Sequence, residues 1–276
     1  MVTRRLAWSL FLLALLLSFP VFVVEAKEPC STATLNGTYG ISIQFTVIAQ
    51  LPHLPAPPFP AVESGIATFD GAGNVSVAYT LSLDGVVVPG SGTGTYTVNP
   101  DCTYSDEVAT SSGSTVHHAG SITGLALVQQ VNFIYTDAWL IGGGTFKKIL
   151  PSGCSLATLK GTYGALEQGT IVAQLPGFPP PPVPFAISGI VTFDGAGNLS
   201  GVATASFGGA TMSGPFKGTY TVNPDCTDSD EFTTSFGVFH HAGTITGWAG
   251  GILGEVQYIY TDPGVVASGT LKKRWP

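Results

Sequence analysis

The stretch TFDGAGNVSVAYTLSL, residues 68–83, contains the two signals that decide the fold. Asp70 and Gly71 stand between two runs in which apolar and polar residues alternate, which is a strong hairpin signal. Residues 75–83 alternate large apolar with small or polar side chains, as a strand with one buried face does. An EF-hand loop would need more acidic ligands and a distant glutamate, and a phosphate loop would need a following helix. The stretch is therefore predicted to be a β-turn and a strand rather than a ligand loop.

The first seven residues of this stretch recur unchanged at residues 192–198. The same offset of 124 residues carries Cys30 onto Cys154, and GTYTVNPDCT at residues 94–103 onto residues 218–227. Each copy spans about 120 residues, which is the usual size of a domain and much longer than a solenoid repeat. The sequence predicts a first domain over residues 27–150 and a second over residues 151–276.

Each copy contains short alternating runs separated by turn sequences such as Asp-Gly and Asn-Pro-Asp. In the first copy we count eight such runs, beginning near residues 37, 65, 75, 93, 103, 115, 128 and 141. Eight consecutive strands on short turns predict an all-β fold of two tandem antiparallel up-and-down β-barrels, which leave no open sheet edge. Two β-sandwiches are the alternative, because strand spacing does not distinguish a closed sheet from two packed sheets.

One connection in each copy is long and rich in proline, at residues 50–63 and 174–186. Prolines at this density cannot donate to a sheet and favour an extended polyproline conformation. We expect a stiff strap over one end of each barrel. The alternative is a lid over a ligand mouth or a docking strip for a partner.

Residues 1–26 have the order of a secretory signal peptide: Arg4 and Arg5, a long apolar run, and small residues before the expected cleavage site. An uncleaved membrane anchor is the alternative, because the run could just span a bilayer. Removal of this segment, with its two arginines and one glutamate, changes the formal net charge from −7 to −8. The acidic mature chain makes nucleic acid an unsuitable partner. The expected location is secreted or periplasmic, with no membrane association after cleavage.

The four cysteines lie at equivalent places in the two copies. Repeated spacing and an even count in an exported chain imply disulfides, and the duplication favours Cys30 with Cys102 and Cys154 with Cys226. Metal binding is the alternative, but no CxxC spacing supports it. We expect no metal and no cofactor.

The histidine doublets at residues 117–118 and 240–241 are the strongest candidates in the sequence for acid–base chemistry. With the preceding turn centred on residues 112–113, Glu107 is expected across from His118, and Glu231 near His241. A carboxylate beside an imidazole could prepare it for proton transfer, which makes these four residues the catalytic candidates. The alternative is a polar cross-strand pair on the outer face of the sheet.

The copies differ most in one strand face, where large residues of the first copy become small in the second. We expect either a cavity in the second barrel or a filler such as Trp248, and we predict that the second copy binds ligand better. Repeated tyrosines, among them Tyr260, are expected in the core, with a stacking surface for sugars or phenolic ligands as the alternative. The predicted ligand cavity consists of Gly201, Ala203, Ala205, Trp248 and Tyr260.

The motifs C-x4-L-x-G-T-Y-G, F-D-G-A-G-N and G-T-Y-T-V-N-P-D-C-T occur in this order twice. In this respect the chain resembles uncharacterised exported bacterial proteins with the same signature. That group looks distantly like the allene oxide cyclase and dirigent barrels, a likeness that rests on strand number and brings no catalytic motif.

Three functions are compatible with these observations. The protein could bind a small apolar or phenolic ligand in a barrel lumen, or it could be a surface interaction module. As the resemblance implies, it could also be a cyclase or isomerase that holds a reactive intermediate in a barrel cavity. The sequence indicates no oligomeric state.

Overall fold

The computed structural model describes residues 29–50, 55–124, 129–149, 153–247 and 254–274. Within these residues the chain forms sixteen strands and two short 3-10 helices. The first copy contains η1 (Thr32–Leu35), β1 (Asn36–Val47), β2 (Phe59–Asp70), β3 (Asn74–Leu83), β4 (Val86–Val98), β5 (Thr103–Thr110), β6 (Thr115–Thr123), β7 (Gln130–Tyr135) and β8 (Leu140–Lys148). The second contains η2 (Leu156–Leu159), β9 (Gly161–Ile171), β10 (Val183–Phe193), β11 (Asn198–Phe207), β12 (Ala210–Val222), β13 (Thr227–Thr234), β14 (Gly237–Thr246), β15 (Glu255–Tyr260) and β16 (Val265–Lys273).

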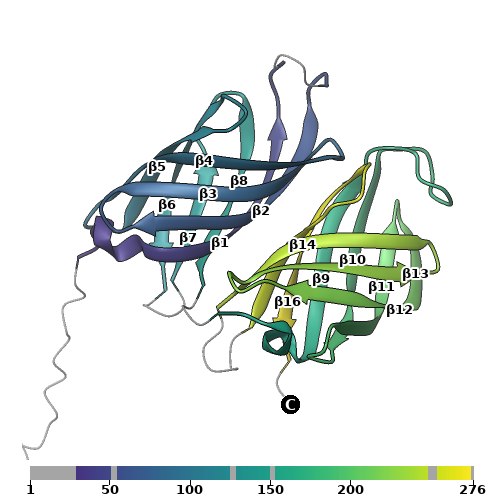
Figure 1. The fold of residues 1–276 in the computed structure, drawn as a ribbon. Coiled ribbons are helices and arrows are strands. Elements are labelled where there is room, and N and C mark those ends of the chain that lie inside the picture. The colour runs from purple at the N-terminus through teal and green to yellow at the C-terminus, as the bar shows by residue number, and fades with distance from the viewer. Residues whose placement is uncertain (1–28, 51–54, 125–128, 150–152, 248–253, 275–276) are drawn as a thin grey trace, which may run out of the picture.

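Each set of eight strands closes into a barrel (Figure 1). Every strand pairs antiparallel with the next one, and closure comes from the pairing of β8 with β1 and of β16 with β9. The predicted tandem up-and-down barrels are thus confirmed over the sandwich alternative. Closure satisfies the backbone hydrogen bonds of both potential edge strands, which an open sheet of this length would leave exposed.

The repeated TFDGAGN stretch forms the turn between β2 and β3 and its equivalent between β10 and β11. The Asp70 carboxylate accepts hydrogen bonds from the backbone N–H groups of Ala72 at 2.7 Å and Asn74 at 2.9 Å. Asp194 makes the equivalent pair of bonds in the second copy at the same distances. The carboxylate therefore binds its own turn, as a turn aspartate does, and the predicted turn is confirmed.

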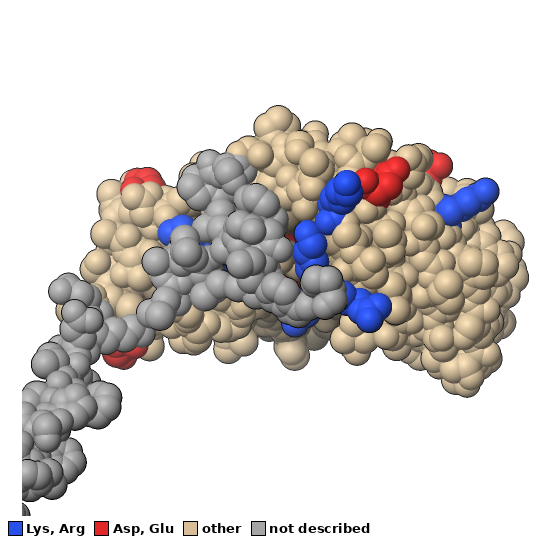
Figure 2. Space-filling view, turned by 90° about the horizontal axis from the view of Figure 1, so that it is seen from below, with Lys and Arg blue, Asp and Glu red and all other residues tan. Residues whose placement is uncertain are grey.

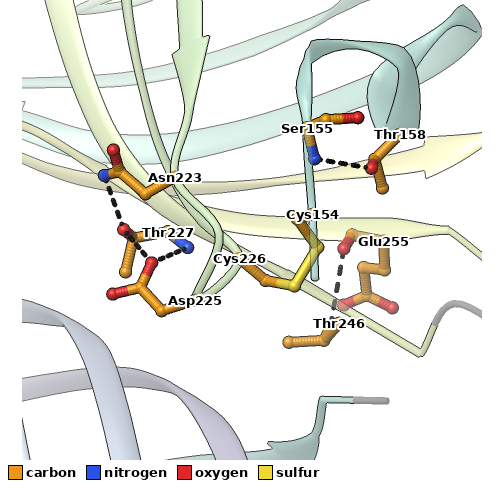
Figure 3. Close-up of a disulfide and its surroundings, with 9 residues drawn as sticks. All are labelled: Cys154, Ser155, Thr158, Asn223, Asp225, Cys226, Thr227, Thr246 and Glu255. Atoms are coloured by element: carbon orange, nitrogen blue, oxygen red, sulfur yellow. Dashed lines mark hydrogen bonds between the residues drawn. A yellow bond between two sulfur atoms is a disulfide. The ribbon is translucent and has the colours of Figure 1, made fainter. Parts of the chain in front are cut away.

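Both predicted disulfides are present and tie the start of each copy to the turn between its fourth and fifth strands. Figure 3 shows the second one, Cys154–Cys226. Asp225 stabilises the turn that carries Cys226 by accepting bonds from the backbone N–H and the hydroxyl of Thr227, at 3.0 and 2.7 Å. Each disulfide thereby holds the 3-10 helix of its copy against one end of the barrel.

That end of each barrel is closed by the 3-10 helix and by aromatic rings. Leu35 is fully buried, and its equivalent Leu159 is 1% exposed. The Tyr96 hydroxyl donates to the carbonyl oxygen of Thr32 at 3.0 Å, and Tyr220 donates to that of Leu156 at 2.9 Å. The repeated tyrosines at this end are core residues whose hydroxyl groups reach backbone partners, as expected for buried tyrosine.

The proline-rich connections lie at the opposite end of the barrels. In the second copy, the Phe178 ring packs against Phe207 and Phe236, with ring centroids 5.0 and 5.7 Å apart. In the first copy, Pro55 lines the lumen. The straps are shorter than the proline-rich stretches, because β2 and β10 already begin at Phe59 and Val183. The described strap residues Pro55 and Phe178 therefore each lie against the lumen of their barrel.

The two barrels have separate hydrophobic cores but pack against each other side by side (Figure 1). Three side chains form the buried apolar centre of this contact: Val62, Ile259 and Val266. Around it, the Thr244 hydroxyl donates to the carbonyl oxygen of Gly65, and the Ser82 hydroxyl to that of Val265, each at 3.0 Å. The independence of the two domains, and their boundary at residue 150, stay predictions.

Basic side chains gather on one face of the molecule. Seen from below, Lys and Arg cluster where the two barrels meet (Figure 2). In the chain, Lys147 and Lys148 lie at the end of β8, and Lys272, Lys273 and Arg274 lie at the end of the second copy. This is the end closed by the 3-10 helices, not the end covered by the straps. In the described part of the chain, no helix is long and apolar enough to cross a bilayer. The predicted signal peptide lies outside the described residues.

Candidate functional site

The lumen of the first barrel is a cavity of about 960 Å³. Its wall is mostly apolar, and includes Ile43, Val77, Leu81, Val108, Val116 and Leu140. Pro55 and Trp139 line it at the strap end. Cavities of this size, with an apolar wall and few polar groups, are typical sites for small molecules.

Glu63 on β2 brings a carboxyl group into this wall. Its cross-strand neighbours are Ile43 and Leu81. Among the described residues, no side chain forms a hydrogen bond or ion pair with it. Burial raises the pKa of Glu63 to about 8, so the carboxyl group keeps its proton at neutral pH. The part of the side chain that is still accessible faces the cavity, which makes Glu63 a hydrogen-bonding group available to a ligand.

His118 lines the same cavity. Its Nδ1 lies 2.7 Å from Oδ1 of Asp106, and the Tyr104 hydroxyl donates to the other oxygen of that carboxylate. The imidazole ring packs against Phe133 and Tyr135, with both ring centroids at 4.6 Å. The buried Nε2 of His118 has no partner among the described residues. The histidine is thus held rigidly, with one nitrogen left open.

The predicted pairing of Glu107 with His118 is wrong by one residue. The strand register places Glu107 opposite His117, and Asp106 opposite His118. The turn is centred on Ser112, since Ala109 pairs with Thr115. A one-residue shift exchanges the two faces of a strand, so the buried histidine has a different carboxylate from the predicted one.

The second copy shows the same shift. Glu231 pairs with His240 rather than with His241, whose partner is Asp230. Glu231 and His240 lie on the outer face, where Nε2 of His240 is 3.2 Å from the carboxylate of Glu231 and Nδ1 is 2.8 Å from that of Asp262. The hydrogen bond to Asp262 is the main cause that raises the pKa of His240. Glu107 and Glu231 are therefore surface partners of the exposed histidines and lie outside both lumens.

The lumen of the second barrel is much smaller, about 160 Å³. Phenylalanine rings occupy it: Phe185, Phe207, Phe216, Phe232 and Phe239 line the remaining space. Phe216 and Phe232 lie 5.6 Å apart between centroids, and Phe232 and Phe239 lie 5.9 Å apart. At the three positions equivalent to Phe216, Phe232 and Phe239, the first copy has Gly92, Val108 and Val116. The volume missing from β11 is thus supplied by neighbouring strands.

Of the predicted cavity residues, Ala203, Ala205 and Tyr260 line the remaining space of the second barrel. Gly201 is covered by the ring of Phe216, since a Cβ added there would come within 2.4 Å of it. Trp248, the predicted filler, lies outside the described residues. The prediction that the second copy binds ligand better rested on its small residues, whereas the structure gives the first barrel the larger lumen.

The second lumen contains a buried polar cluster. Glu167 accepts a hydrogen bond from the Tyr258 hydroxyl at 2.9 Å and another from the Tyr260 hydroxyl. Burial raises the pKa values of both tyrosines well above normal, and the Glu167 carboxylate adds to this effect. Burial acts to lower the pKa of His241, but the carboxylate of Asp230 outweighs it and the pKa is raised. Glu167 already has protein partners, unlike Glu63.

Glu63, Asp106 and Glu167 were not predicted as site residues, although the sequence contains a signal for the first of them. In β2 the inward-facing residues Ala61, Ala67 and Phe69 alternate with outward-facing ones, and Glu63 shares their parity. At the offset of 124 residues, Glu63 matches Ile187 and Glu167 matches Ile43. A carboxylate on the apolar face of a strand, present in only one copy, would have identified both glutamates.

Within the described parts of the chain, no group of three or more His, Cys, Asp or Glu side chains could hold a metal ion. Cys30, Cys102, Cys154 and Cys226 are all bound in disulfides. Asp228 lies deep in the second barrel, where burial raises the pKa of its carboxyl group well above the usual value. A carboxyl group in that state is a poor metal ligand, because ligation requires the charged form.

No protein-family model matches the chain, and no curated protein matches it. Among solved structures it is similar to a variant of transferrin binding protein B from Haemophilus parasuis Hp5, with 9% identity, 87% of this chain and 76% of the other covered, and a TM-score of 0.29. The isotype 1 transferrin binding protein B from serogroup B Neisseria meningitidis has 7% identity, coverages of 91% and 79%, and a TM-score of 0.29.

A protein of unknown function from the DUF3598 family of Nostoc punctiforme has 12% identity, coverages of 87% and 97%, and a TM-score of 0.23. At these TM-scores and identities, the likeness to the three structures carries no argument about this chain. None of these three neighbours is an allene oxide cyclase or a dirigent protein. The functional argument therefore rests on the residues of the two lumens.

Proposed function

We propose that the protein is an exported tandem barrel that binds a small, mostly apolar ligand in the lumen of the first barrel. The observation that carries this proposal is the cavity of about 960 Å³, apolar in its wall and provided with the unpaired carboxyl group of Glu63. The two disulfides support export, because they persist in oxidising compartments. The proposal assigns binding to the first copy, whereas the sequence favoured the second.

The second barrel supports the first by packing against it. Its own lumen is filled by phenylalanine rings and leaves about 160 Å³, too little for a ligand of ordinary size. The contact around Val62 and Ile259 buries apolar side chains of both barrels. In this proposal the duplication retains one barrel as a binding module and turns the other into a solid partner.

The test is to give the first lumen the phenylalanines of the second. The variant V77G/G92F/V108F/V116F reproduces in the first barrel the residues found at 201, 216, 232 and 239. Binding of the uncharged fluorescent probe N-phenyl-1-naphthylamine to the full chain is measured by titration. We expect the probe to bind the natural protein and to bind this variant at least tenfold more weakly, because the rings occupy the space of the probe.

A matched control places two phenylalanines on the outside of the same strands. Ala109 and Thr115 are exposed cross-strand partners directly beside the inward-facing Val108 and Val116. The variant A109F/T115F should bind the probe as the natural protein does. Equal binding by the filled variant, with its circular dichroism unchanged, would reject the first lumen as the site, and so would a natural protein that does not bind the probe.

A cyclase or isomerase acting in the same lumen is the second candidate function. It is favoured by one observation, namely that Glu63 and His118 both line the cavity. In this case H118Q should leave ligand affinity unchanged and stop conversion of the bound molecule. Small molecules extracted from natural and H118Q preparations would then differ as isomers in chromatography at equal mass. Identical extracts would exclude this function for His118.

A further inference from the structure

The titratable groups that line the first lumen include a carboxyl group but, among the described residues, no lysine or arginine. Four titratable side chains line it: Glu63 from β2, Tyr79 from β3, His118 from β6 and Tyr135 from β7. Asp106 on β5 stands behind His118 as its partner. Elsewhere the strands around Glu63 present apolar groups, such as Ile43 on β1 and Phe146 on β8. None of the described lining residues is a lysine or an arginine, and the described basic side chain of the wall, His118, already has the carboxylate of Asp106 beside its Nδ1.

The lysines at the end of β8 in the first copy lie at the barrel end closed by η1, away from the mouth of the lumen. Lys147 forms an ion pair with Glu255 of the second barrel, and Lys148 donates to the carbonyl oxygen of Asn36 at 3.0 Å. Both lie at the last residues of β8, at the barrel end that η1 closes and not at the strap end. At the mouth, the turn between β3 and β4 carries Asp84. The field along the lumen therefore favours a cation at the mouth and disfavours an anion.

Among the described residues Glu63 has no hydrogen-bond or ion-pair partner, although its carboxylate adds to the effect of burial in raising the pKa values of Tyr79 and Tyr135. The buried carboxylate of the second barrel does have such partners. The cross-strand pair Ile43 and Glu63 of the first barrel corresponds to Glu167 and Ile187 in the second. Glu167 accepts hydrogen bonds from two tyrosine hydroxyl groups. In the first barrel one of the corresponding residues is Phe133, which has no hydroxyl group to donate. The other is Tyr135, which lines the cavity but forms no hydrogen bond with Glu63, so a donor that enters the cavity can bind this carboxyl group.

We propose that the ligand of the first lumen is a lipophilic amine whose ammonium group pairs with the Glu63 carboxylate while its apolar body fills the cavity. This inference rests on the proposed function. In an apolar wall, the attraction between a carboxylate and an ammonium group is stronger than a hydrogen bond from a neutral donor. This attraction offsets the free-energy cost of desolvating the carboxylate. Binding then removes the proton from Glu63 and passes it to solvent. The amine keeps its own proton, and the O–H bond of the Glu63 carboxyl group is the bond that breaks, with its proton taken up by water.

The proton release gives the proposal a signature in pH. Because the pKa of Glu63 is raised to about 8, binding of an ammonium ion below that pH must displace one proton. Affinity for an amine should therefore rise about tenfold per pH unit up to about pH 8 and then level off until the amine itself loses its proton, at about pH 10. An alcohol of the same length should show no such rise, and a carboxylate should bind more weakly as the pH rises.

The experiment uses octylamine, 1-octanol and octanoate as competitors for N-phenyl-1-naphthylamine on the full chain. At pH 8.5 we expect octylamine to compete at least tenfold better than 1-octanol, and octanoate to compete least. E63Q should remove the advantage of octylamine over 1-octanol and its pH dependence, with each competitor compared against the probe affinity of the same variant. The matched control is E107Q, which removes an exposed carboxylate from the outer face of the same barrel and should change neither.

Each outcome decides one statement. Equal competition by octylamine and 1-octanol at pH 8.5, or an amine advantage that survives in E63Q, would overturn the amine proposal and leave lumen binding intact. Preference for octanoate would overturn it as well. Failure of the probe to bind the natural protein would instead reject the proposed function itself, so the two failures can be told apart.

Discussion

In corresponding cross-strand pairs, the two barrels exchange residue types between the two strands. The first barrel pairs Ile43 with Glu63, where the second pairs Glu167 with Ile187. Two further pairs are altered in a similar way: Phe45 with Ala61 corresponds to Gly169 with Phe185, and Val77 with Gly92 corresponds to Gly201 with Phe216. Side chains of cross-strand partners lie about 5 Å apart, so either strand can supply the bulk that a layer of the lumen needs.

These exchanges preserve the packing of the barrel wall, but they change the free volume of the lumen and the partners of its carboxyl group. In the latter two pairs a large residue faces a small one in both copies, and the first pair keeps one isoleucine and one glutamate, so the sheet keeps its packing. The carboxyl group, however, moves from a strand where it has no partner to one where Tyr258 and Tyr260 donate to it. The filled barrel and the hollow barrel therefore differ by the placement of a few side chains on one backbone.

The largest effect should be common to both barrels. The double variants C30S/C102S and C154S/C226S each remove a disulfide that closes a sequence separation of 72 residues. Chain entropy predicts a fall in the free energy of unfolding of about 4 kcal/mol in each case. Urea unfolding of the full chain, followed by circular dichroism, measures it. A nearly unchanged midpoint in one variant would mean that the corresponding barrel is held by its partner instead.

The next effect should separate the barrels. E167I leaves two buried tyrosine hydroxyls without an acceptor and should lower the free energy of unfolding by about 3 kcal/mol. E63I removes a carboxyl group that has no partner among the described residues, and it should leave stability equal or raise it. Both substitutions replace a glutamate by isoleucine, and they occur in corresponding cross-strand pairs of the two barrels. Each therefore serves as the control of the other. Equal destabilisation would contradict the difference between the lumens.

A third effect concerns pH. The folded pKa of Glu63 is raised above its unfolded value of about 4.5, so the folded state keeps a proton that the unfolded chain loses. The stability contributed by this group is present at low pH and is lost as the pH rises from about 4.5 to about 8. Between pH 6 and 7.5, the difference in free energy of unfolding between E63Q and the natural protein should grow by about 2 kcal/mol in favour of E63Q.

Urea midpoints of both proteins across this range provide the measurement. Asp228 in the second barrel has a raised pKa of the same sign, but it is present in both proteins and cancels in the comparison. A difference that is independent of pH would mean that Glu63 is ionised in the folded state.

Strand number and disulfide pairing could be predicted because they depend on local signals repeated at one offset, whereas closure is favoured over two sandwiches only because it leaves no open edge. Alternation of apolar and polar residues fixes which face of β3 is buried, and the duplication selects one pairing of Cys30, Cys102, Cys154 and Cys226. These properties follow from periodicity and turn chemistry, which nearby residues determine.

Register and lumen volume could not be predicted in the same way. The partner of His118 depends on whether the turn is centred on Ser112 or half a residue later, and composition does not determine this. The lumen volume depends on layers formed by several strands, so the small residues Ala203 and Ala205 indicated a cavity that Phe216 and Phe232 remove. Only a comparison of cross-strand pairs, once register is known, reveals which barrel is hollow.

The smallest effect should again be equal in both barrels, and it tests the repeated turn. Bonds from Asn74 hold the pKa of the Asp70 carboxylate below its usual range, and the equivalent bonds from Asn198 lower the pKa of Asp194 to about 2. A lowered folded pKa means that this stabilisation is present above the unfolded pKa of about 3.8 and is lost as the pH falls toward the folded value. D70A and D194A should therefore each lower the thermal unfolding midpoint slightly near neutral pH, and the deficit should shrink as the pH is lowered below about 4. Calorimetry of the full chain measures both. If D70A alone had an effect, or if the deficit were the same at both pH values, the turn would be doing more in the hollow barrel than closing a hairpin.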